Sequence, residues 1–313
     1  MPPELILHHY DFSSFSQKVR LVLGIKGIAW RSVSIPSTLP KPDYMPLTGG
    51  YRRAPALQIG ADVYCDSVRI IAELEERFPE PSIYPGPDTI AQRGFTAGLE
   101  RWTDAVLIRT TINYISSLHP QGARFTPEFL ADRAALFGKP KPGLGHGWET
   151  AAKYLAQLRP QLTWIGDMLS DGRPYLLGDK MSLADCVVYH AIWIMDQLAY
   201  RRVALIPAGV RNWMDRVAAR GHGSPTPMSA LEALDVAAAA KPLPSFPSEA
   251  LEGDPAVGSE VSITPIDTGR ANSSTGVLTY IDATRAGLLH RNDRVGEVVV
   301  HFPRFGYRVR TIA

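Results

Sequence analysis

The chain has 313 residues, of which 45% are hydrophobic and 20% charged, and its formal net charge is +2. This length and composition are typical of a folded protein with two or more domains and a large core. The nearly neutral charge gives no general attraction to nucleic acid or to an anionic membrane surface, so we expect neither as a partner.

The cysteines and the N-terminus bear on the compartment. Cys65 and Cys186 are far apart in the sequence and form no C-x-x-C or metal-type motif, which excludes a disulfide-rich secreted scaffold. The segment MPPELILHHYDF lacks the basic and long apolar regions of a signal peptide, and no run of about 18 apolar residues predicts a membrane span. We therefore expect a cytoplasmic protein.

The chain begins with the pattern of a strand, a helix and a second strand. The apolar run at 4–10 predicts a short buried strand, and residues 30–35 predict another. Between them, SQKVRLVLGIKG has the apolar spacing of a helix, with Ser16 as its expected N-cap and Gly27 at its C-terminus. A β-α-β unit of this length indicates parallel strands with a right-handed crossover.

The next segments complete a small α/β pattern. Residues 36–50 are rich in Pro and Gly and predict irregular structure or one short helical turn, and two short apolar runs around residues 60–62 predict a hairpin. The segment DSVRIIAELEERF predicts a helix, with Asp66 or Ser67 as its N-cap. The following PEPSIYPGPD cannot continue a helix and is expected to be a linker.

In the rest of the chain the apolar residues have helical spacing up to residue 240 and alternate with polar ones after residue 249. The predicted helices are at 88–118, 127–137, 149–171, 182–200, 208–220 and 226–240, with a loop at 138–148. After a linker at 242–249, the period becomes two in VSITPI, GVLTYI, EVVVHF and YRVRTI, which predicts a small β module. We expect three units, at 1–80, 88–241 and 250–313, and because the last is too small for a large core of its own, we expect it to pack on the helical body.

Three segments, in this order, resemble the soluble glutathione transferases over residues 4 to about 240. FSSFSQKVRLVL is similar to the serine-type active-site loop, close to that of the zeta class. YRRAPALQIGADVYCDS is similar to the family's cis-proline segment and the acidic-Ser site that follows it, and YLLGDKMSLADCVVY to a helix-start motif of the second domain. The resemblance implies a thioredoxin-like α/β domain followed by an all-helical domain. The small β-rich C-terminal extension lies outside the family's two-domain pattern.

The helix-start motif has a structural explanation. Ser182 and Asp185 have the spacing of a capping-box variant, with flanking apolar residues placed as a hydrophobic staple. Asp185 is therefore not a candidate for a catalytic carboxylate.

The catalytic residue implied by the resemblance is Ser13, which lies six residues before Val19. The thiol of glutathione has a pKa of about 8.5–9, and only its thiolate is a good nucleophile. A hydroxyl that donates a hydrogen bond to the sulfur near a helix N-terminus favours the thiolate. Ser14 and Ser16 are the weaker candidates, and the alternative is that all three serines belong only to the loop and the cap.

The glutathione-binding residues implied by the resemblance follow the second strand. A cis bond before Pro55 leaves the backbone of Ala54 available to pair with the cysteinyl backbone of glutathione. Asp66 and Ser67 would hold the γ-glutamyl group, although the family usually has Glu where this chain has the shorter Asp. Arg52 and Arg53 are further candidates, as partners for a glutathione carboxylate.

The favoured function is conjugation of glutathione to a small apolar electrophile, which would bind between the domains with Phe12 and Phe15 on one wall. Two alternatives stay open: a glutathione-dependent isomerase, dehalogenase or ether-cleaving enzyme, or a non-catalytic binding or scaffold protein whose β module recruits a partner. The resemblance implies glutathione as co-substrate and a homodimer. No metal is expected, because the adjacent His8 and His9 point to opposite faces of a strand. A thiol-disulfide oxidoreductase is disfavoured, because no cysteine lies near position 13.

Overall fold

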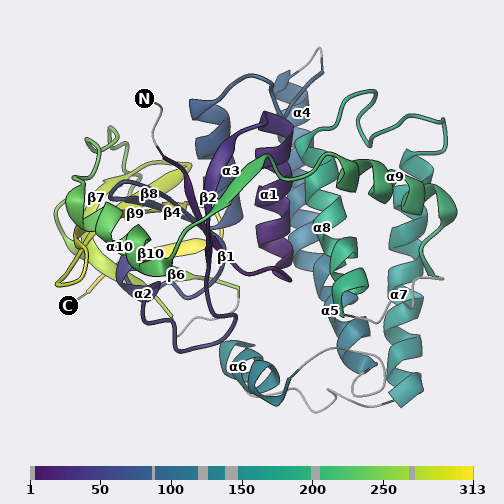
Figure 1. Ribbon diagram of the computed structural model, residues 1–313, viewed down its shortest axis with the longest axis horizontal. Coiled ribbons are helices and arrows are strands. Elements are labelled where there is room, and N and C mark those ends of the chain that lie inside the picture. Colours follow the sequence, from purple (N-terminus) through teal and green to yellow (C-terminus); the bar gives the residue numbers. More distant parts are fainter. Residues whose placement is uncertain are drawn as a thin grey trace.

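One long β-sheet connects the two ends of the chain (Figure 1). The computed structural model describes residues 4–86, 89–118, 126–137, 147–198, 205–267 and 272–312. The sheet has ten strands in the order β10-β6-β7-β8-β9-β4-β3-β1-β2-β5. Residues 138–146 of the loop predicted at 138–148 lie outside the described residues, and helix begins at Gly147.

The first domain is thioredoxin-like, as the sequence predicts. Its elements are β1 (Ile6–His9), α1 (Ser14–Lys26), β2 (Ala29–Ser34), α2 (Met45–Thr48), β3 (Ala56–Ile59), β4 (Asp62–Cys65) and α3 (Ser67–Arg77). β1 is parallel to β2 and antiparallel to β3, and β3 is antiparallel to β4. The β-α-β unit and the hairpin are therefore confirmed.

Helix α1 begins three residues earlier than the sequence predicts. Its N-cap is Ser13, whose hydroxyl oxygen accepts a hydrogen bond from the backbone N–H of Ser16. The prediction of Ser16 as the N-cap is wrong, because Ser16 lies in the first turn and supplies the N–H that is capped. The predicted C-terminus is confirmed: Gly27 takes the left-handed conformation, with φ 64°, that glycine adopts without steric cost.

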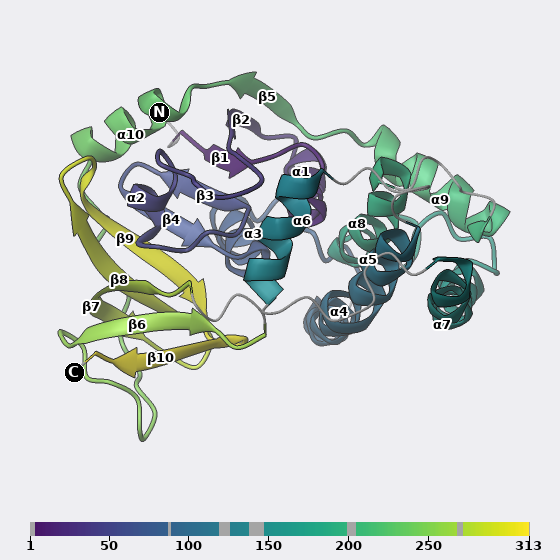
Figure 2. The same ribbon diagram turned by 90° about the horizontal axis from the view of Figure 1, so that it is seen from below.

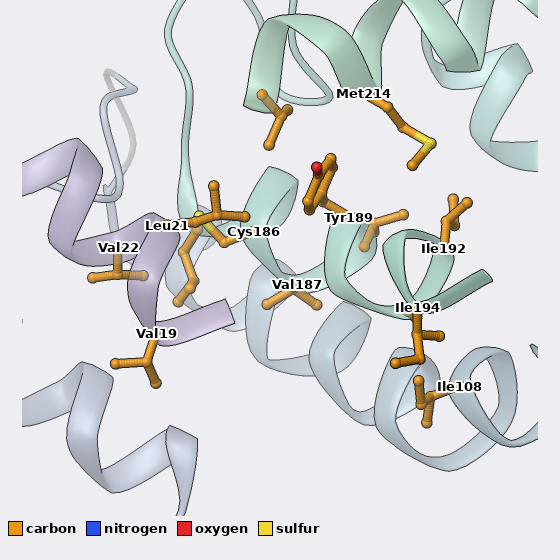
Figure 3. Close-up of a cluster of buried hydrophobic side chains, with 14 of the residues drawn as sticks. Val19, Leu21, Val22, Ile108, Cys186, Val187, Tyr189, Ile192, Ile194 and Met214 are labelled. Carbon is orange, nitrogen blue, oxygen red and sulfur yellow. The ribbon is translucent and has the colours of Figure 1, made fainter. Parts of the chain in front are cut away.

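The second domain is helical. Its elements are α4 (Thr89–Trp102), the π-helical turn η1 (Thr103–Leu107), α5 (Ile108–Ser117), α6 (Pro127–Phe137), α7 (Gly147–Met168), α8 (Leu183–Leu198) and α9 (Ala208–Ala219). Figure 3 shows apolar side chains of α1 and α8 facing each other, with α5 and α9 on either side. This shared core fixes the first domain to the helical domain.

Asp185 is structural, as expected. It is buried in the first turn of α8, where its carboxylate accepts hydrogen bonds from the backbone N–H groups of Leu176 and Ser182 and from the Trp213 indole, each at 2.9 Å. A carboxylate surrounded by donors from three segments anchors the start of the helix.

The segment after α9 returns to the first domain. The sequence predicts a helix at 226–240, but residues Ser224–Pro227 form strand β5, which is parallel to β2, and α10 covers only Ala230–Ala239. Strand β5 contains two prolines and all its side chains are exposed, so its sequence has no alternation of apolar and polar residues that would predict a strand. Its structure is determined by pairing with β2.

The C-terminal strands are β6 (Glu260–Pro265), β7 (Ser274–Ile281), β8 (Arg285–Asn292), β9 (Gly296–Pro303) and β10 (Tyr307–Thr311). The prediction that this module packs on the helical body is wrong. β9 pairs in parallel with β4, and the module lies on the side of the first domain away from α7 and α9 (Figures 1 and 2). The unpaired backbone groups of the β4 edge provide the pairing surface.

Alternation along the strands separates two cores. Leu7 and Tyr64 point toward α1, α3 and the helical domain. Their neighbours Ile6 and Val63 point to the opposite face, where α10 and the C-terminal strands cover the sheet. None of the helices in the described part of the chain combines the length and apolar character that a membrane span requires.

Candidate functional site

Strand register places the predicted site segments at the same end of three neighbouring strands, β1, β3 and β4. His8 lies opposite Ala56, and Ala56 lies opposite Cys65. The loop with Ser13 follows the end of β1, the Ala54–Pro55 bond precedes β3, and Asp66 follows β4. Because paired strands lie about 5 Å apart, these three loops start within a space that a tripeptide spans.

The hydrogen bonds of Ser13 leave its hydroxyl in the donor role. Its oxygen accepts from the backbone N–H of Ser16 at 3.2 Å and from the Ser16 hydroxyl at 2.8 Å. A serine hydroxyl has two acceptor positions and one hydrogen, so the hydrogen is what Ser13 has left to offer a ligand. Ser13 is also the N-cap of a thirteen-residue helix, whose positive end favours a nearby anion.

The bond between Ala54 and Pro55 is cis, which confirms the sequence prediction. The two preceding carbonyls are tied to the segment that contains α2: the Tyr44 hydroxyl donates to the Arg53 oxygen at 2.5 Å, and the Lys41 ammonium to the Arg52 oxygen at 2.8 Å. The β1–β3 pairing begins only at Ala56, so the half-buried Ala54 lies just outside the strand ladder.

Asp66 has an uncommon backbone conformation. Its φ is 74°, the one positive value among the non-glycine residues that the structure describes. It is the N-cap of α3, where one carboxylate oxygen accepts from the Val68 N–H at 2.9 Å, and the buried Ser67 begins the helix. A strained conformation of this kind is stable only when its surroundings hold it, and such positions cluster at ligand sites.

The second oxygen of Asp66 is contacted by the C-terminal module, a contact that the sequence does not predict. The Tyr307 hydroxyl donates to it at 2.8 Å and lies 3.3 Å from the Tyr51 hydroxyl. Burial and then the charge of Asp66 raise the pKa of Tyr307 well above its usual value, so Tyr307 stays a donor. Local alternation in YRVRTI carries no signal for this contact, because it depends on how β10 is placed by the rest of the sheet.

Both arginines next to the cis bond are already paired. Arg53 forms two hydrogen bonds with the carboxylate of Asp267, at 2.8 and 3.3 Å, and Asp267 follows β6 of the module. Arg52 is buried and forms an ion pair with Asp132 of α6. Arg53 is the more exposed of the two, so it is the one that a ligand carboxylate could reach.

Phe12 lies before α1 and Phe15 in its first turn, and the two rings have different aromatic neighbours. Phe12 lies against Tyr10 and against Phe129 of α6, with ring centroids 4.9 and 5.7 Å apart. Phe15 lies 5.2 Å from the ring of His190 in α8. Both therefore contact aromatic side chains, but from two different helices of the second domain.

A buried ionic cluster lies behind the Ser13 loop. The ammonium group of Lys18 in α1 is 2.8 Å from the carboxylate of Glu100 and 3.2 Å from that of Asp104, and His190 is 3.3 Å from Asp104. Burial acts to lower the pKa of Lys18, but the two carboxylates outweigh it and raise that pKa, so Lys18 stays charged. The cluster therefore forms an ionic contact between α1 of the first domain and the helical domain.

His8 and His9 have separate partners, as expected from their alternation. His8 lies 2.8 Å from the Gln58 amide oxygen, whereas His9 contacts the Ser32 hydroxyl and Arg20. Burial lowers the pKa of His8 to about 4 and that of His9 to about 3, so both are neutral at pH 7.

Family models match the first domain and part of the helical domain. The family model of the glutathione S-transferase N-terminal domain matches residues 7–82, and that of the C-terminal domain matches residues 148–216. A GST-like protein of known structure from Pseudomonas syringae is 34% identical, with a TM-score of 0.77, and the match covers 99% of this chain and 100% of that one. The match therefore includes the C-terminal module.

Two further relatives cover less. A zeta-class glutathione S-transferase from Euphorbia esula is 39% identical over an alignment of 89 residues, and the match covers 26% of this chain and only 38% of that relative. A stringent starvation protein A homolog from Haemophilus ducreyi is 25% identical over 205 residues, which are 65% of this chain and 80% of that relative.

Proposed function

Because the chain belongs to the glutathione S-transferase family, we propose that it binds glutathione across the three loops at the ends of β1, β3 and β4. The observation that carries the proposal is the register of His8, Ala56 and Cys65, which aligns the starts of these loops. The tripeptide would extend from Asp66, past Ala54, to Ser13.

Each end of the ligand has a partner of suitable chemistry. The Asp66 carboxylate has about four acceptor positions, and two of them are used by Val68 and Tyr307, which leaves room for the γ-glutamyl ammonium. The start of α3 at Ser67 supplies backbone N–H groups for the neighbouring γ-glutamyl carboxylate, and the Arg53 guanidinium would bind the same carboxylate. The backbone of Ala54, before the cis bond, would pair with the cysteinyl residue.

The proposed reaction is conjugation at the sulfur. Ser13 donates a hydrogen bond to the sulfur of glutathione and so favours its thiolate, and the thiol proton is released to solvent. The thiolate attacks an apolar electrophile, the S–C bond forms, and the leaving group departs with the electron pair of the bond that breaks. Lowering the thiol pKa by about two units requires about 2.7 kcal/mol of preferential thiolate stabilisation. A charge-assisted hydrogen bond together with a helix N-terminus supplies an effect of that size.

Calorimetric titration with glutathione tests the binding step. Asp66→Asn keeps the size of the side chain but removes the counter-charge of the ligand ammonium, and we expect at least a ten-fold weaker Kd. Asp293→Asn, an exposed change in the β8–β9 turn, is the matched control. Equal affinity in the wild type and the Asp66 variant would remove Asp66 from the site.

A second candidate function is that of a protein with the glutathione-transferase fold that binds glutathione but catalyses no reaction with it. One observation favours it: a relative that covers more of this chain than the zeta-class transferase does is named a stringent starvation protein A homolog rather than a transferase. Glutathione binding without conjugation of any member of an electrophile panel would support this candidate. The zeta-class relative keeps a glutathione-dependent isomerase, dehalogenase or ether-cleaving activity within that panel.

We further propose a cytoplasmic homodimer, on family membership alone. The edge of β4 is paired with β9, so two copies cannot associate through that edge. Light scattering at micromolar concentration should give twice the mass of the chain, and a monomeric mass would contradict the proposal.

A further inference from the structure

The C-terminal module is joined to the loop that carries the cis-proline segment. The Ser274 hydroxyl donates to the Thr48 oxygen at 2.7 Å, and the Thr275 N–H to the Gly49 oxygen at 3.1 Å. The approach is close at Gly50, where a Cβ atom would lie 2.5 Å from the Ser273 oxygen. The module thus fixes the backbone that leads into Ala54 and Pro55.

Two side chains of the module reach the candidate γ-glutamyl site, and they do so in opposite chemical senses. Tyr307 presents a hydrogen-bond donor to an anion, the carboxylate of Asp66. Asp267 presents an anion to a cation, the guanidinium of Arg53. The first contact orients the group that would bind a ligand ammonium, and the second competes for the group that would bind a ligand carboxylate.

We propose that the C-terminal module is part of the glutathione site, with Tyr307 as a positioning residue for Asp66 and Asp267 as a competing anion that a ligand carboxylate displaces from Arg53. This inference rests on the proposed function and adds to it the residues that set affinity for the two charged groups of the γ-glutamyl end.

The burial of the two residues supports these roles. Tyr307 is 8% exposed, and its ring packs against Phe302 and Tyr51, with centroids 5.3 and 6.4 Å away, so its hydroxyl is held at Asp66 by the core of the module. The side chain of Asp267 is 55% exposed, so it can move into solvent when a ligand arrives. Tyr307 is thus a fixed contact, and the ion pair of Asp267 is exchangeable.

The experiment uses the full chain and three ligands: glutathione, its analogue without the α-amino group, and its analogue without the α-carboxylate. Affinities come from calorimetry at low ionic strength. Tyr307→Phe should weaken the binding of glutathione about five-fold, which is typical for the loss of one net hydrogen bond. It should leave the affinity for the des-amino analogue unchanged. Asp267→Asn should raise the affinity for glutathione about three-fold, but leave the affinity for the decarboxylated analogue unchanged.

Controls separate these effects from loss of structure. Tyr280→Phe removes another buried phenol of the module, bonded to His301 rather than to Asp66, and should leave all three affinities unchanged. Asp293→Asn is the control for Asp267→Asn, and the gain from Asp267→Asn should shrink at high salt because the pair is exposed. If Tyr307→Phe does not fold, the surface variant Asp267→Asn still provides the test.

The outcomes distinguish the two levels of the proposal. Wild-type protein that binds none of the three ligands would overturn the proposed function. Wild-type protein that binds glutathione, with neither variant changing its affinity or with both changing all three ligands equally, would overturn the role of the module alone.

Discussion

Replacing Ser13 by alanine removes one hydroxyl with two separable effects. The hydroxyl oxygen caps α1 by accepting the Ser16 N–H, and the hydroxyl hydrogen is free for the ligand sulfur. Loss of the cap should lower the free energy of unfolding by about 1 kcal/mol. Loss of a hydrogen bond to a charged group, about 1.5–3 kcal/mol, should raise the thiol pKa of bound glutathione by about 1–2 units.

The readout is the ultraviolet absorbance of the thiolate in the binary complex, titrated against pH, together with turnover of chlorodinitrobenzene. In Ser13→Ala, turnover at neutral pH should fall about ten- to hundred-fold, because less thiolate is present, and the deficit should shrink as the pH rises. The Kd for glutathione should change little, since most proposed contacts lie on Ala54, Asp66 and Ser67.

Two neighbouring serines provide controls. Ser14→Ala should leave the titration curve in place. Ser16→Ala removes a hydrogen bond that Ser13 accepts, so it should shift the curve less than Ser13→Ala does. An unshifted curve in Ser13→Ala would show that Ser13 is not the activating group, and a shift in Ser14→Ala alone would place the active serine one residue later.

Two further changes test the packing and the pH dependence. Gly24→Ala should destabilise the protein despite the better helix propensity of alanine, because its Cβ atom would lie 2.2 Å from the Gly221 oxygen, whereas Gly98→Ala, in open space on α4, should be neutral or stabilising in thermal unfolding. The pKa of the buried His8 is lowered to about 4, so the unfolded chain binds its proton first, and stability should fall by about 1.4 kcal/mol per pH unit for this residue as the pH drops from about 6.5 toward 4. The free energy of unfolding, measured in urea between pH 7 and 5, should depend less steeply on pH in His8→Gln than in the wild type. An equal pH dependence in the two proteins would show that His8 does not have the lowered pKa.

Local sequence patterns predict most elements of the first domain. Apolar runs and turn residues predict β1, α1, β2, the hairpin and α3, because each element has its own period and its own cap. The N-cap of α1 was misplaced because Ser13, Ser14 and Ser16 all have capping chemistry. Hydrogen-bond geometry alone decides among them.

Contacts between distant segments were not predictable in this way. The strand β5 has no alternation, and its structure comes from pairing with β2. The β module was recognised from its period of two, but its partner was not, because an alternating strand carries no information about which sheet edge it will join. The contacts of Tyr307 and Asp267 with the candidate site follow from that pairing and were missed with it.

A crystal structure of the protein with bound glutathione tests the central claim most directly. We expect the sulfur within hydrogen-bond distance of the Ser13 hydroxyl, the cysteinyl backbone paired with Ala54, and the γ-glutamyl ammonium on the Asp66 carboxylate. Glutathione bound elsewhere, or no glutathione at saturating concentration with Tyr307 and Asp267 still on Asp66 and Arg53, would contradict the claim that these three loops form a glutathione site.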